Sequence, residues 1–313
     1  MRVLLTGASG FIGGHLLRAL LDDGHRVVAV LRRNPVSGVW MAQHLAKDFS
    51  EALTPADWEG AVQDIDVVIN AVGVLREHGS QRFEALHHRA PAALFEAAVA
   101  AGVKRIVQIS ALGADDEATT GYHLTKKAAD DFLLSLPVES IVVQPSVVFG
   151  EGGAATAMFT MQARLPLIPL PGQGQQIVQP IHVDDLADLV LALATRDGIA
   201  GRYAGHRVAA VGPEPLTMRE FYTRLRRALG MASPARFLHI PMWYMGMMAQ
   251  AGRWMPGSPL DPDTLSMLER GSSAPVTDTE AILGRRPRGV ESFFDSEPGQ
   301  SDSDANSSNT RTE

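Results

Sequence analysis

The stretch RVLLTGASGFIGG, residues 2–14, decides the fold. In it, an unbroken apolar run meets glycines at positions 7, 10 and 13, and a helix-length segment follows. Residues without a Cβ permit a tight turn and a close backbone approach, and the free N–H groups at a helix start attract a diphosphate. We therefore predict that a dinucleotide binds here, at Gly7, Ser9, Gly10, Phe11, Ile12 and Gly13.

Further short apolar runs rich in Val and Ile occur at 26–31, 66–70, 105–110 and 140–146. Unbroken apolarity is typical of strands buried on both faces, as in a parallel sheet. Helix-length segments separate these runs at 11–23, 81–101 and 122–135. The alternation predicts an α/β fold with a doubly wound parallel sheet.

The sequence becomes rich in Gly and Pro after Gly150, and helical patterns return at 182–195 and 215–230. We predict a nucleotide-binding domain at 1–150, completed by about 182–195. Residues 151–181 and 196–290 would form a smaller, mostly helical C-terminal lobe for substrate or partner binding. The acidic tail at 296–313 lacks an apolar anchor, and we expect it to be disordered.

Composition excludes several classes of function. The chain has no cysteine, so disulfides, thiolate metal sites and cysteine nucleophiles are absent, and we identify no metal site. The net charge of −7 disfavours nucleic-acid binding. The first expected strand begins at Arg2 and no apolar run is long enough to span a bilayer, so we expect no signal or transit peptide and a cytoplasmic protein.

The segment GYHLTKKAAD, residues 121–130, places Tyr122 four residues before Lys126. Helical spacing of this kind puts both side chains on one face. A free tyrosine has a pKa of about 10, and a nearby ammonium lowers it toward the range where proton transfer is efficient. We interpret the pair as a proton-transfer dyad. The alternative is a packed helix with a half-buried tyrosine.

The second strand ends in Leu31, where an NAD-selective site usually carries an acid that binds the ribose 2′-hydroxyl. Arg32 and Arg33 follow. Guanidinium groups pair bidentately with phosphate oxygens, so they suit the 2′-phosphate of NADP. We predict that NADP(H) binds in preference to NAD(H); a solvated basic turn is the alternative.

The G-x-x-G-x-x-G spacing resembles the short-chain dehydrogenase/reductase superfamily, in its extended and atypical branches. NAVG at 70–73, QPSVVFG at 144–150 and HVDDLAD at 182–188 also resemble landmarks of that superfamily, in the right order. The resemblance implies a Rossmann-type fold in which Tyr122 is the acid/base and Lys126 also holds the nicotinamide ribose. It further implies cofactor contacts from Asp48, Phe49, Ala71, Val72, Gly73 and Pro145.

The third member of the site departs from that superfamily. Ser110 resembles the serine that ends the fifth strand, and we include it among the catalytic candidates. The next position, where the extended branch places its hydroxyl, is Ala111, with Thr119 and Thr120 as substitutes. His87 falls near the position of a supporting asparagine in many relatives, although a solvated helix surface explains the pair His87/His88 more simply.

The segment 239–259 contains five methionines and two tryptophans. We favour a buried core helix of the small lobe. The alternative is a lid or a lipid-facing element, giving contact with a membrane surface or a protein complex and a membrane-associated protein. Together with residues 260–294, the segment resembles the NADPH-binding alpha-subcomplex accessory subunit of complex I and its bacterial stand-alone relatives.

These observations favour an NADP(H)-dependent oxidoreductase that moves hydride to or from a carbonyl or alcohol of a hydrophobic or quinone-like substrate. A non-catalytic NADPH-holding or redox-sensing module is the first alternative. A nucleotide-sugar epimerase or dehydratase is the second, which Leu31, Ala111 and the apolar second lobe disfavour. Pairing of the dyad helices of two protomers, a common arrangement in relatives, would give a homodimer.

Overall fold

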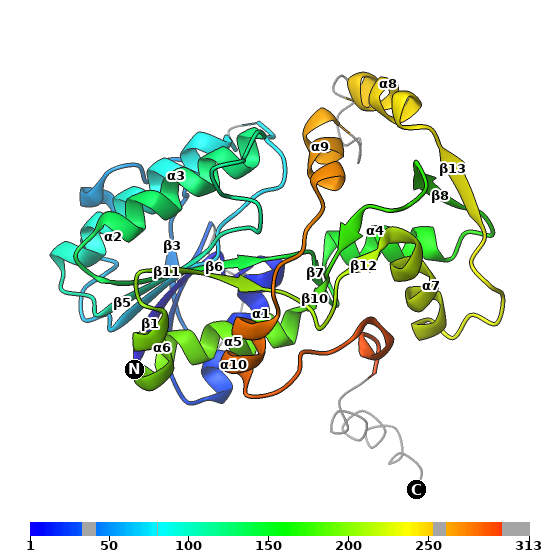
Figure 1. Cartoon of the computed structure of the whole chain (residues 1–313). Coiled ribbons are helices and arrows are strands. Elements are labelled where there is room, and N and C mark those ends of the chain that lie inside the picture. The colour runs from blue at the N-terminus through cyan, green and yellow to red at the C-terminus, as the bar shows by residue number, and fades with distance from the viewer. Residues whose placement is uncertain (33–41, 80, 253–260, 296–313) are drawn as a thin grey trace, which may run out of the picture.

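The computed structural model describes residues 1–32, 42–79, 81–252 and 261–295. The expected disordered tail at 296–313 and Arg33 lie outside these residues. The predicted doubly wound sheet is confirmed, with seven parallel strands in the order β11-β6-β5-β4-β1-β2-β3 (Figure 1). The strands are β1 Arg2–Thr6, β2 Arg26–Leu31, β3 Gln43–Ala46, β4 Val67–Asn70, β5 Arg105–Ile109, β6 Glu139–Pro145 and β11 His206–Ala210.

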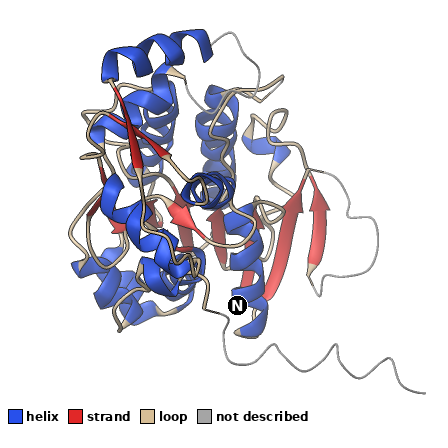
Figure 2. Cartoon of the chain, turned by 90° about the vertical axis from the view of Figure 1, so that its right-hand side faces the viewer, coloured by secondary structure: helices blue, strands red, loops and turns tan. Residues whose placement is uncertain are grey.

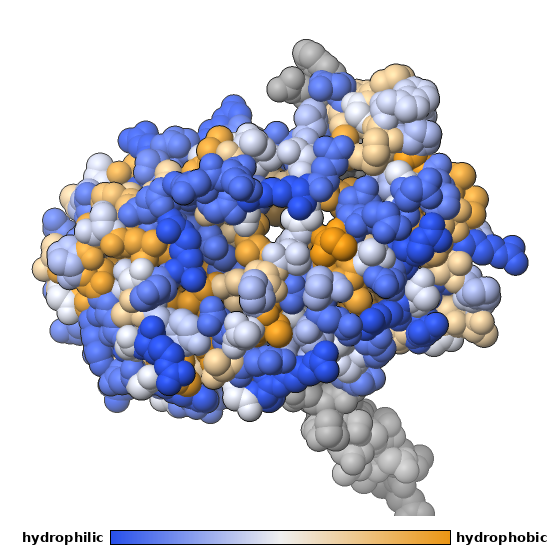
Figure 3. Space-filling view, viewed as in Figure 1, coloured by the Kyte–Doolittle hydropathy of each residue, from blue (hydrophilic) through white to orange (hydrophobic). Residues whose placement is uncertain are grey.

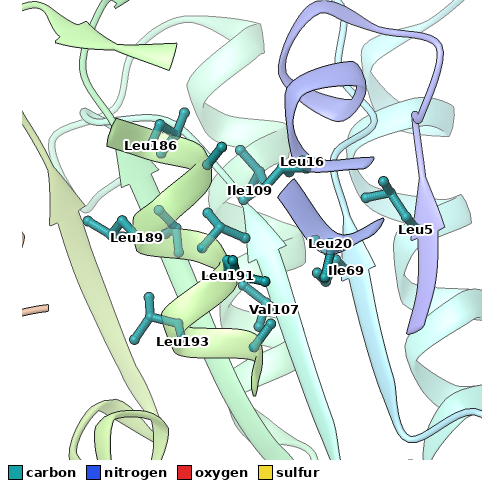
Figure 4. Close-up of a cluster of buried hydrophobic side chains, with 14 of the residues drawn as sticks. Leu5, Leu16, Leu20, Ile69, Val107, Ile109, Leu186, Leu189, Leu191 and Leu193 are labelled. Atoms are coloured by element: carbon teal, nitrogen blue, oxygen red, sulfur yellow. The ribbon is translucent and has the colours of Figure 1, made fainter. Parts of the chain in front are cut away.

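Helices cover both faces of this sheet. One face carries α1 (Phe11–Asp22), α5 (Val183–Thr195), α6 (Asp197–Tyr203) and α10 (Thr277–Leu283). The other carries α2 (Ala90–Ala100) and α3 (Gly121–Ser135), with the 3₁₀ turn η1 (Pro55–Asp57) and the π-helix η2 (Glu84–Arg89). Figure 2 shows the sheet between the two layers, and Figure 4 shows Leu16 of α1 next to Ile109 of β5 and Leu20 of α1 next to Ile69 of β4.

The edge strand β11 and the helices α6 and α10 come from residues 196–290, which we had assigned to the small lobe. Buried Thr279 attaches α10 to the end of β11. Its hydroxyl donates to the Ala209 carbonyl at 3.1 Å and accepts from the Val211 N–H at 3.1 Å. The nucleotide-binding layers therefore draw on the chain well beyond 182–195.

The second lobe has its own core of aromatic and aliphatic side chains, including Phe149, Phe159, Phe221 and Tyr222. Its helices are α4 (Ala154–Ala163), α7 (Met218–Ala228), α8 (Met242–Gly252) and α9 (Pro262–Arg270), with the 3₁₀ turn η3 (Val290–Ser292). Three two-stranded sheets join them, β7 (Val148–Phe149) with β10 (Ile181–His182), β9 (Ile177–Val178) with β12 (Leu216–Thr217), and β8 (Ile168–Pro171) with β13 (Phe237–Ile240).

The apolar segment at 239–259 is not a core helix where the structure describes it. Residues 253–259 lie outside the described part, and α8 buries only Ala249 and Gly252 fully. Its large side chains are exposed instead, with Trp243 at 69% and Met247 at 58%. Our favoured prediction for this segment is therefore wrong for α8. Across the described residues, no helix combines the length and apolarity needed to cross a membrane.

Candidate cofactor and active site

The glycine loop lies where the strand order reverses, between β1 and β4. Gly7 has a φ of +71°, and a Cβ there would lie 2.7 Å from the Ala71 carbonyl oxygen. A Cβ at Gly13 would overlap the Gly7 carbonyl. The predicted residues of the loop after β1 and of the segment after β4 are therefore brought together, at the point where doubly wound sheets bind their ligands.

The amino terminus of α1 offers donors to this point. The helix begins at Phe11, and its N-cap Gly10 makes no side-chain cap. The first N–H groups of a helix have no partner within it, so the amides of Phe11, Ile12 and Gly13 are suited to an anionic group. These N–H groups fit a diphosphate, and Gly7 and Gly13 allow the close backbone packing that places them, because a Cβ at either position would collide with backbone atoms.

The residues expected at the adenosine end of the cofactor are Arg32, Asp48 and Phe49, and each makes a different kind of contact. The Arg32 guanidinium donates at 2.7 Å to the Gln81 side-chain oxygen when that amide is turned toward it. The Asp48 carboxylate accepts from the Ser50 N–H at 2.8 Å and hydroxyl at 2.7 Å. Phe49 is buried and packs edge-on against Trp58. The Phe49 side chain therefore builds the core beneath this end of the site.

The dyad stands on the first turns of α3. Thr120 is the N-cap of that helix, and its hydroxyl accepts from the His123 N–H at 3.3 Å. Tyr122 is partly buried and Lys126 is 3% exposed. The Lys126 ammonium donates to the carbonyls of Ile109 at 2.9 Å and Val72 at 3.3 Å. Lys126 thus reaches from α3 to the carboxyl ends of β4 and β5, beside the glycine loop.

Burial sets the electrostatics of the dyad. It raises the pKa of Tyr122 to about 12, and the charge of Asp130 adds to the rise. Burial lowers the pKa of the Lys126 ammonium below its ordinary value, while the Asp130 carboxylate opposes that change. Tyr122 therefore holds its proton firmly in this arrangement, and our expectation that Lys126 lowers the pKa of Tyr122 is wrong for it, because burial and Asp130 outweigh the ammonium.

Ser110 does not reach toward Tyr122 as a free hydroxyl. It directly follows β5 and donates at 2.5 Å to the Asp130 carboxylate, one helical turn beyond Lys126 on α3. Burial raises the pKa of that carboxyl. Ala111 is buried and has no hydroxyl, and the Thr120 hydroxyl is engaged at the N-cap. Of the two predicted substitutes for the missing hydroxyl, Thr120 is therefore committed to the start of α3.

His87 is buried, so our solvated interpretation is wrong for this residue. Its Nε2 accepts from the Val74 N–H at 3.0 Å, which leaves Nδ1 protonated and 3.2 Å from the Thr125 hydroxyl. The ring stands perpendicular to that of Tyr122, with centroids 5.3 Å apart. Burial and the nearby Lys126 charge lower the pKa of His87 to about 2.

The π-helix η2 explains why this burial was missed. Leu86 and Ala90 are four residues apart and point into the sheet interface, as an α-helix requires. The wider π turn brings His87 inward as well. Hydrophobic periodicity contains no signal for a π turn. The position of His87 near the asparagine of relatives was the only available indication.

Helix α9 crosses to the loops that flank the dyad. At its start, the N-cap Asp261 pairs with Arg76 at 3.2 Å. At its end, Arg270 donates to the Gly113 carbonyl at 2.8 Å and to both oxygens of Asp115 at 2.6 Å. The second lobe is thus held over the segments that follow β4 and β5. Figure 3 shows the surface hollowed between the lobes near this helix.

The parallel sheet, the glycine loop at its switch point and the Tyr–Lys helix together define a Rossmann-type NAD(P)-binding protein of the short-chain dehydrogenase/reductase type. The family model described as the NAD dependent epimerase/dehydratase family matches residues 3–203, and the chain belongs to this family.

Two curated relatives extend the comparison. The chain is 30% identical over 191 residues to "Ceramide reductase" of Caulobacter vibrioides, covering 61% of this chain and 60% of the relative. It is 27% identical over 224 residues to the mitochondrial "NADH dehydrogenase [ubiquinone] 1 alpha subcomplex subunit 9" of Arabidopsis thaliana, covering 68% of this chain and 54% of the relative. The chain thus spans little more than half the length of these relatives. The resemblance to the complex I accessory-subunit group is confirmed.

Solved structures share the fold. The human epimerase family protein SDR39U1 with NADPH has a TM-score of 0.71 at 21% identity, covering 94% of this chain and 97% of that one. A nucleoside-diphosphate-sugar epimerase from Staphylococcus aureus has a TM-score of 0.74 at 17% identity, covering 94% and 99%.

Proposed function

We propose that this protein is an NADP(H)-dependent oxidoreductase that moves hydride to or from a carbonyl or alcohol carbon of a hydrophobic substrate. The observation that carries the proposal is the position of Lys126. Its ammonium is fixed by the carbonyls of Ile109 and Val72, one helical turn from Tyr122 and beside the glycine cradle. A buried cation next to a tyrosine is the arrangement that acid/base work at this site requires.

Tyr122 and Lys126 divide the proton chemistry. When bound, the reduced nicotinamide supplies the hydride that the carbonyl carbon accepts. Tyr122 then gives its proton to the carbonyl oxygen, and the Lys126 ammonium stabilises the phenolate that remains. The alcohol direction runs the same transfers in reverse. Neutral His87 packs against the Tyr122 ring and fixes its orientation without adding a charge.

The preference for NADP(H) rests on the end of β2. Leu31 offers no carboxylate to a ribose 2′-hydroxyl, and Arg32 follows directly with its guanidinium engaged by a neutral amide. An arginine so placed can exchange Gln81 for a phosphate. Relatives of this fold include one solved with NADPH and one solved with NAD, so the choice depends on these residues.

A hydrophobic substrate is supported by the segment between Gly73 and Arg76. Leu75 is 63% exposed there, directly after the Val74 amide that His87 holds next to the dyad. The name of one relative, a ceramide reductase, also points to an apolar carbonyl compound. A ketone or aldehyde on a long apolar chain is the substrate class we propose.

Two measurements test this function. Fluorescence titration should give saturable NADPH binding, with NADH at least about tenfold weaker, and Arg32→Ala should remove most of that difference. In a screen of long-chain ketones and aldehydes with NADPH, Tyr122→Phe should lower turnover by about 10²–10⁴-fold without weakening NADPH binding. The matched control is Tyr203→Phe, which removes a phenol on α6. Equal binding of NADH would refute the cofactor preference.

A non-catalytic NADPH-holding module is the second candidate, and Ser110 favours it. The Ser110 hydroxyl is bonded to Asp130 and its neighbour is Ala111, so neither residue offers a free hydroxyl to orient a substrate oxygen. Under this function NADPH binds normally, and no carbonyl in the screen is reduced. Tyr122→Phe would then leave every measured property other than local stability unchanged.

A further inference from the structure

We propose that the outward face of α8 and the adjoining β8–β13 edge dock on an anionic lipid membrane. From Met242 to Gly252, α8 contains no charged side chain, and Gln250 is its only amide. A helix that is apolar all round is stable when both of its sides are covered. Here α8 packs on α9 with one side only, and the other side has no cover in the described part of the chain.

The uncovered side forms a continuous strip. Trp243 and Met247 are one helical turn apart, as are Tyr244 and Met248, so the four side chains share one face of α8. Their exposed fractions run from 42% for Tyr244 to 69% for Trp243. The Trp243 and Tyr244 rings meet edge to face, with centroids 5.8 Å apart. Aromatic rings with a polar tip are the residues that concentrate at membrane interfaces.

The strip continues onto the neighbouring two-stranded sheet. Leu238 of β13 is paired with Pro169 of β8, and Leu238 and nearby Leu167 are about half exposed. Figure 3 shows α8 projecting from the upper part of the second lobe with pale and tan residues on its surface. We call Leu167, Leu238, Trp243, Tyr244, Met247 and Met248 the α8 surface. An exposed apolar patch of this extent marks an interaction site.

Charge selects the partner. The chain carries a net charge of −7, yet between Glu151 and Asp184 there is one arginine, the exposed Arg164, and no acid. Between Glu220 and Asp261 there are five arginines and no acid. Of these, Arg227 and Arg236 are exposed. Arg224 pairs with Glu214 and Glu291, and Arg226 is buried, so these two add no free charge to the surface. Both segments contribute to the α8 surface. Basic residues next to an apolar, aromatic face are complementary to anionic lipid headgroups, each contributing about 1 kcal/mol near the membrane.

Two arginines lie beside the patch. The Arg236 carbonyl accepts from the Ile168 N–H at 2.8 Å, which places exposed Arg236 next to Leu167. The Arg219 guanidinium lies 5.0 Å above the Phe237 ring of β13. Among the described residues neither guanidinium pairs with a carboxylate, and the polar contact of Arg219 is with the neutral acceptor His239 Nε2 at 2.7 Å. They remain available to phosphate oxygens at the rim of the surface.

A second copy of this chain fits the α8 surface less well. In a two-fold symmetric contact the same patch meets itself, so arginines without acids would face arginines. An anionic bilayer supplies the opposite charge over its whole area. The proposal concerns a surface outside the cofactor cradle, and it holds whether or not the dyad turns over substrate.

Vesicle flotation tests the proposal on the full chain. We expect the protein to float with vesicles containing about 30% phosphatidylglycerol, and to float several-fold less with pure phosphatidylcholine or in 1 M salt. Trp243→Ser with Met247→Ser should weaken binding by about tenfold or more, because two interfacial side chains are lost. Arg164→Gln with Arg236→Gln should lower binding on anionic vesicles toward the phosphatidylcholine level. Leu124→Ser on α3, about half exposed like Met248, is the matched control.

Thermal unfolding of each variant shows that it is folded, so a loss of binding is not a loss of structure. The proposal is overturned if the wild type does not float with anionic vesicles, or if the Trp243/Met247 variant floats as well as the wild type. It is also overturned if the wild type is a dimer in solution that this variant converts to a monomer, because the α8 surface would then be covered by a second copy.

Discussion

His87 is a buried histidine whose neutrality is fixed by two contacts. Its Nε2 accepts from the Val74 amide, and Nδ1 faces the Thr125 hydroxyl. Protonation at Nε2 would break the first contact and would place a second charge near Lys126. The side chain therefore links the segment after β4, which carries Gly73, to the dyad helix α3.

This arrangement predicts a pH dependence of stability. The pKa of His87 falls from its ordinary value of 6.5 to about 2 on folding, so the unfolded chain binds more protons between these values. The stabilisation is complete above about pH 6.5 and is lost as pH falls, by up to about 1.4 kcal/mol per pH unit. In urea unfolding between pH 6.5 and 5, His87→Gln should flatten this decline. His88→Gln, at the half-buried neighbour, should keep the wild-type slope.

Asp130 gives a prediction of opposite sign. Burial raises the pKa of its carboxyl on folding, so the free energy of unfolding falls as pH rises from the ordinary pKa of the group toward the raised one. The Asp130→Asn variant carries an amide whose oxygen can still accept from Ser110 and which never ionises. The Tm of this variant should therefore rise relative to that of the wild type between pH 5 and pH 8. The expected rise is about 2–4 °C for each kcal/mol of unfolding free energy that the wild type loses as Asp130 ionises. A difference in Tm that is constant with pH would show that Asp130 stays in one protonation state.

At the scale of elements, the glycine loop depends on contact between the start of α1 and the end of β1. Gly13 and Gly14 are adjacent on α1 but meet different surroundings. A Cβ at position 13 would overlap the Gly7 carbonyl, whereas one at position 14 would lie 3.8 Å from the nearest atom, the Ala8 carbonyl oxygen.

The two alanine variants should therefore differ in stability and in NADPH binding. Gly13→Ala should cost about 1–3 kcal/mol of stability or more through overpacking, and it should abolish NADPH binding because the cradle opens. Gly14→Ala should be neutral or stabilising by up to about 1 kcal/mol, since alanine favours the helix. Urea unfolding and fluorescence titration measure both properties. Equal loss of NADPH binding in both variants would contradict the assignment of the cradle to Gly13.

Strands with continuous apolar runs could be predicted from the sequence, because β1, β2, β4, β5 and β6 are buried on both faces. The two edge strands could not. β3 reads QHLA and β11 begins with exposed His206 and Arg207, since an edge position buries less of each residue. For α8 the sequence showed apolarity all round, but apolarity alone does not say whether protein or another partner covers a helix.

At the scale of the whole molecule, some site residues are placed by contacts between neighbours in the sequence, and others by contacts between distant segments. Tyr122 and Lys126 are one turn apart, so local spacing predicted their common face. The bond from Ser110 to Asp130 joins β5 to α3, and the burial of His87 depends on a π turn packed against α3. Local spacing does not contain these contacts, which is why Asp130 was missed and His87 was misjudged.

The longest-range contacts at the site are those of α9, which joins the second lobe to the loops around the dyad. Arg270 supplies three bonds to the segment after β5. Its side chain is 30% exposed, so its contribution to global stability should be small, about 1 kcal/mol or less. Loss of the Arg270 side chain should instead weaken the hold of α9 over the site.

Replacement of Arg270 tests this division between stability and closure. Arg270→Gln should increase hydrogen exchange in α9 and raise KM for a carbonyl substrate by about fivefold, which corresponds to about 1 kcal/mol. NADPH affinity should be unchanged, because Arg270 contacts Gly113 and Asp115 and not the glycine loop. Arg82→Gln, which removes an exposed pair with Glu77, should alter neither property. If α9 exchanges no faster in the Arg270 variant, the other contacts of α9, its pair with Arg76 and its packing on α8, are enough to hold the lobe in place.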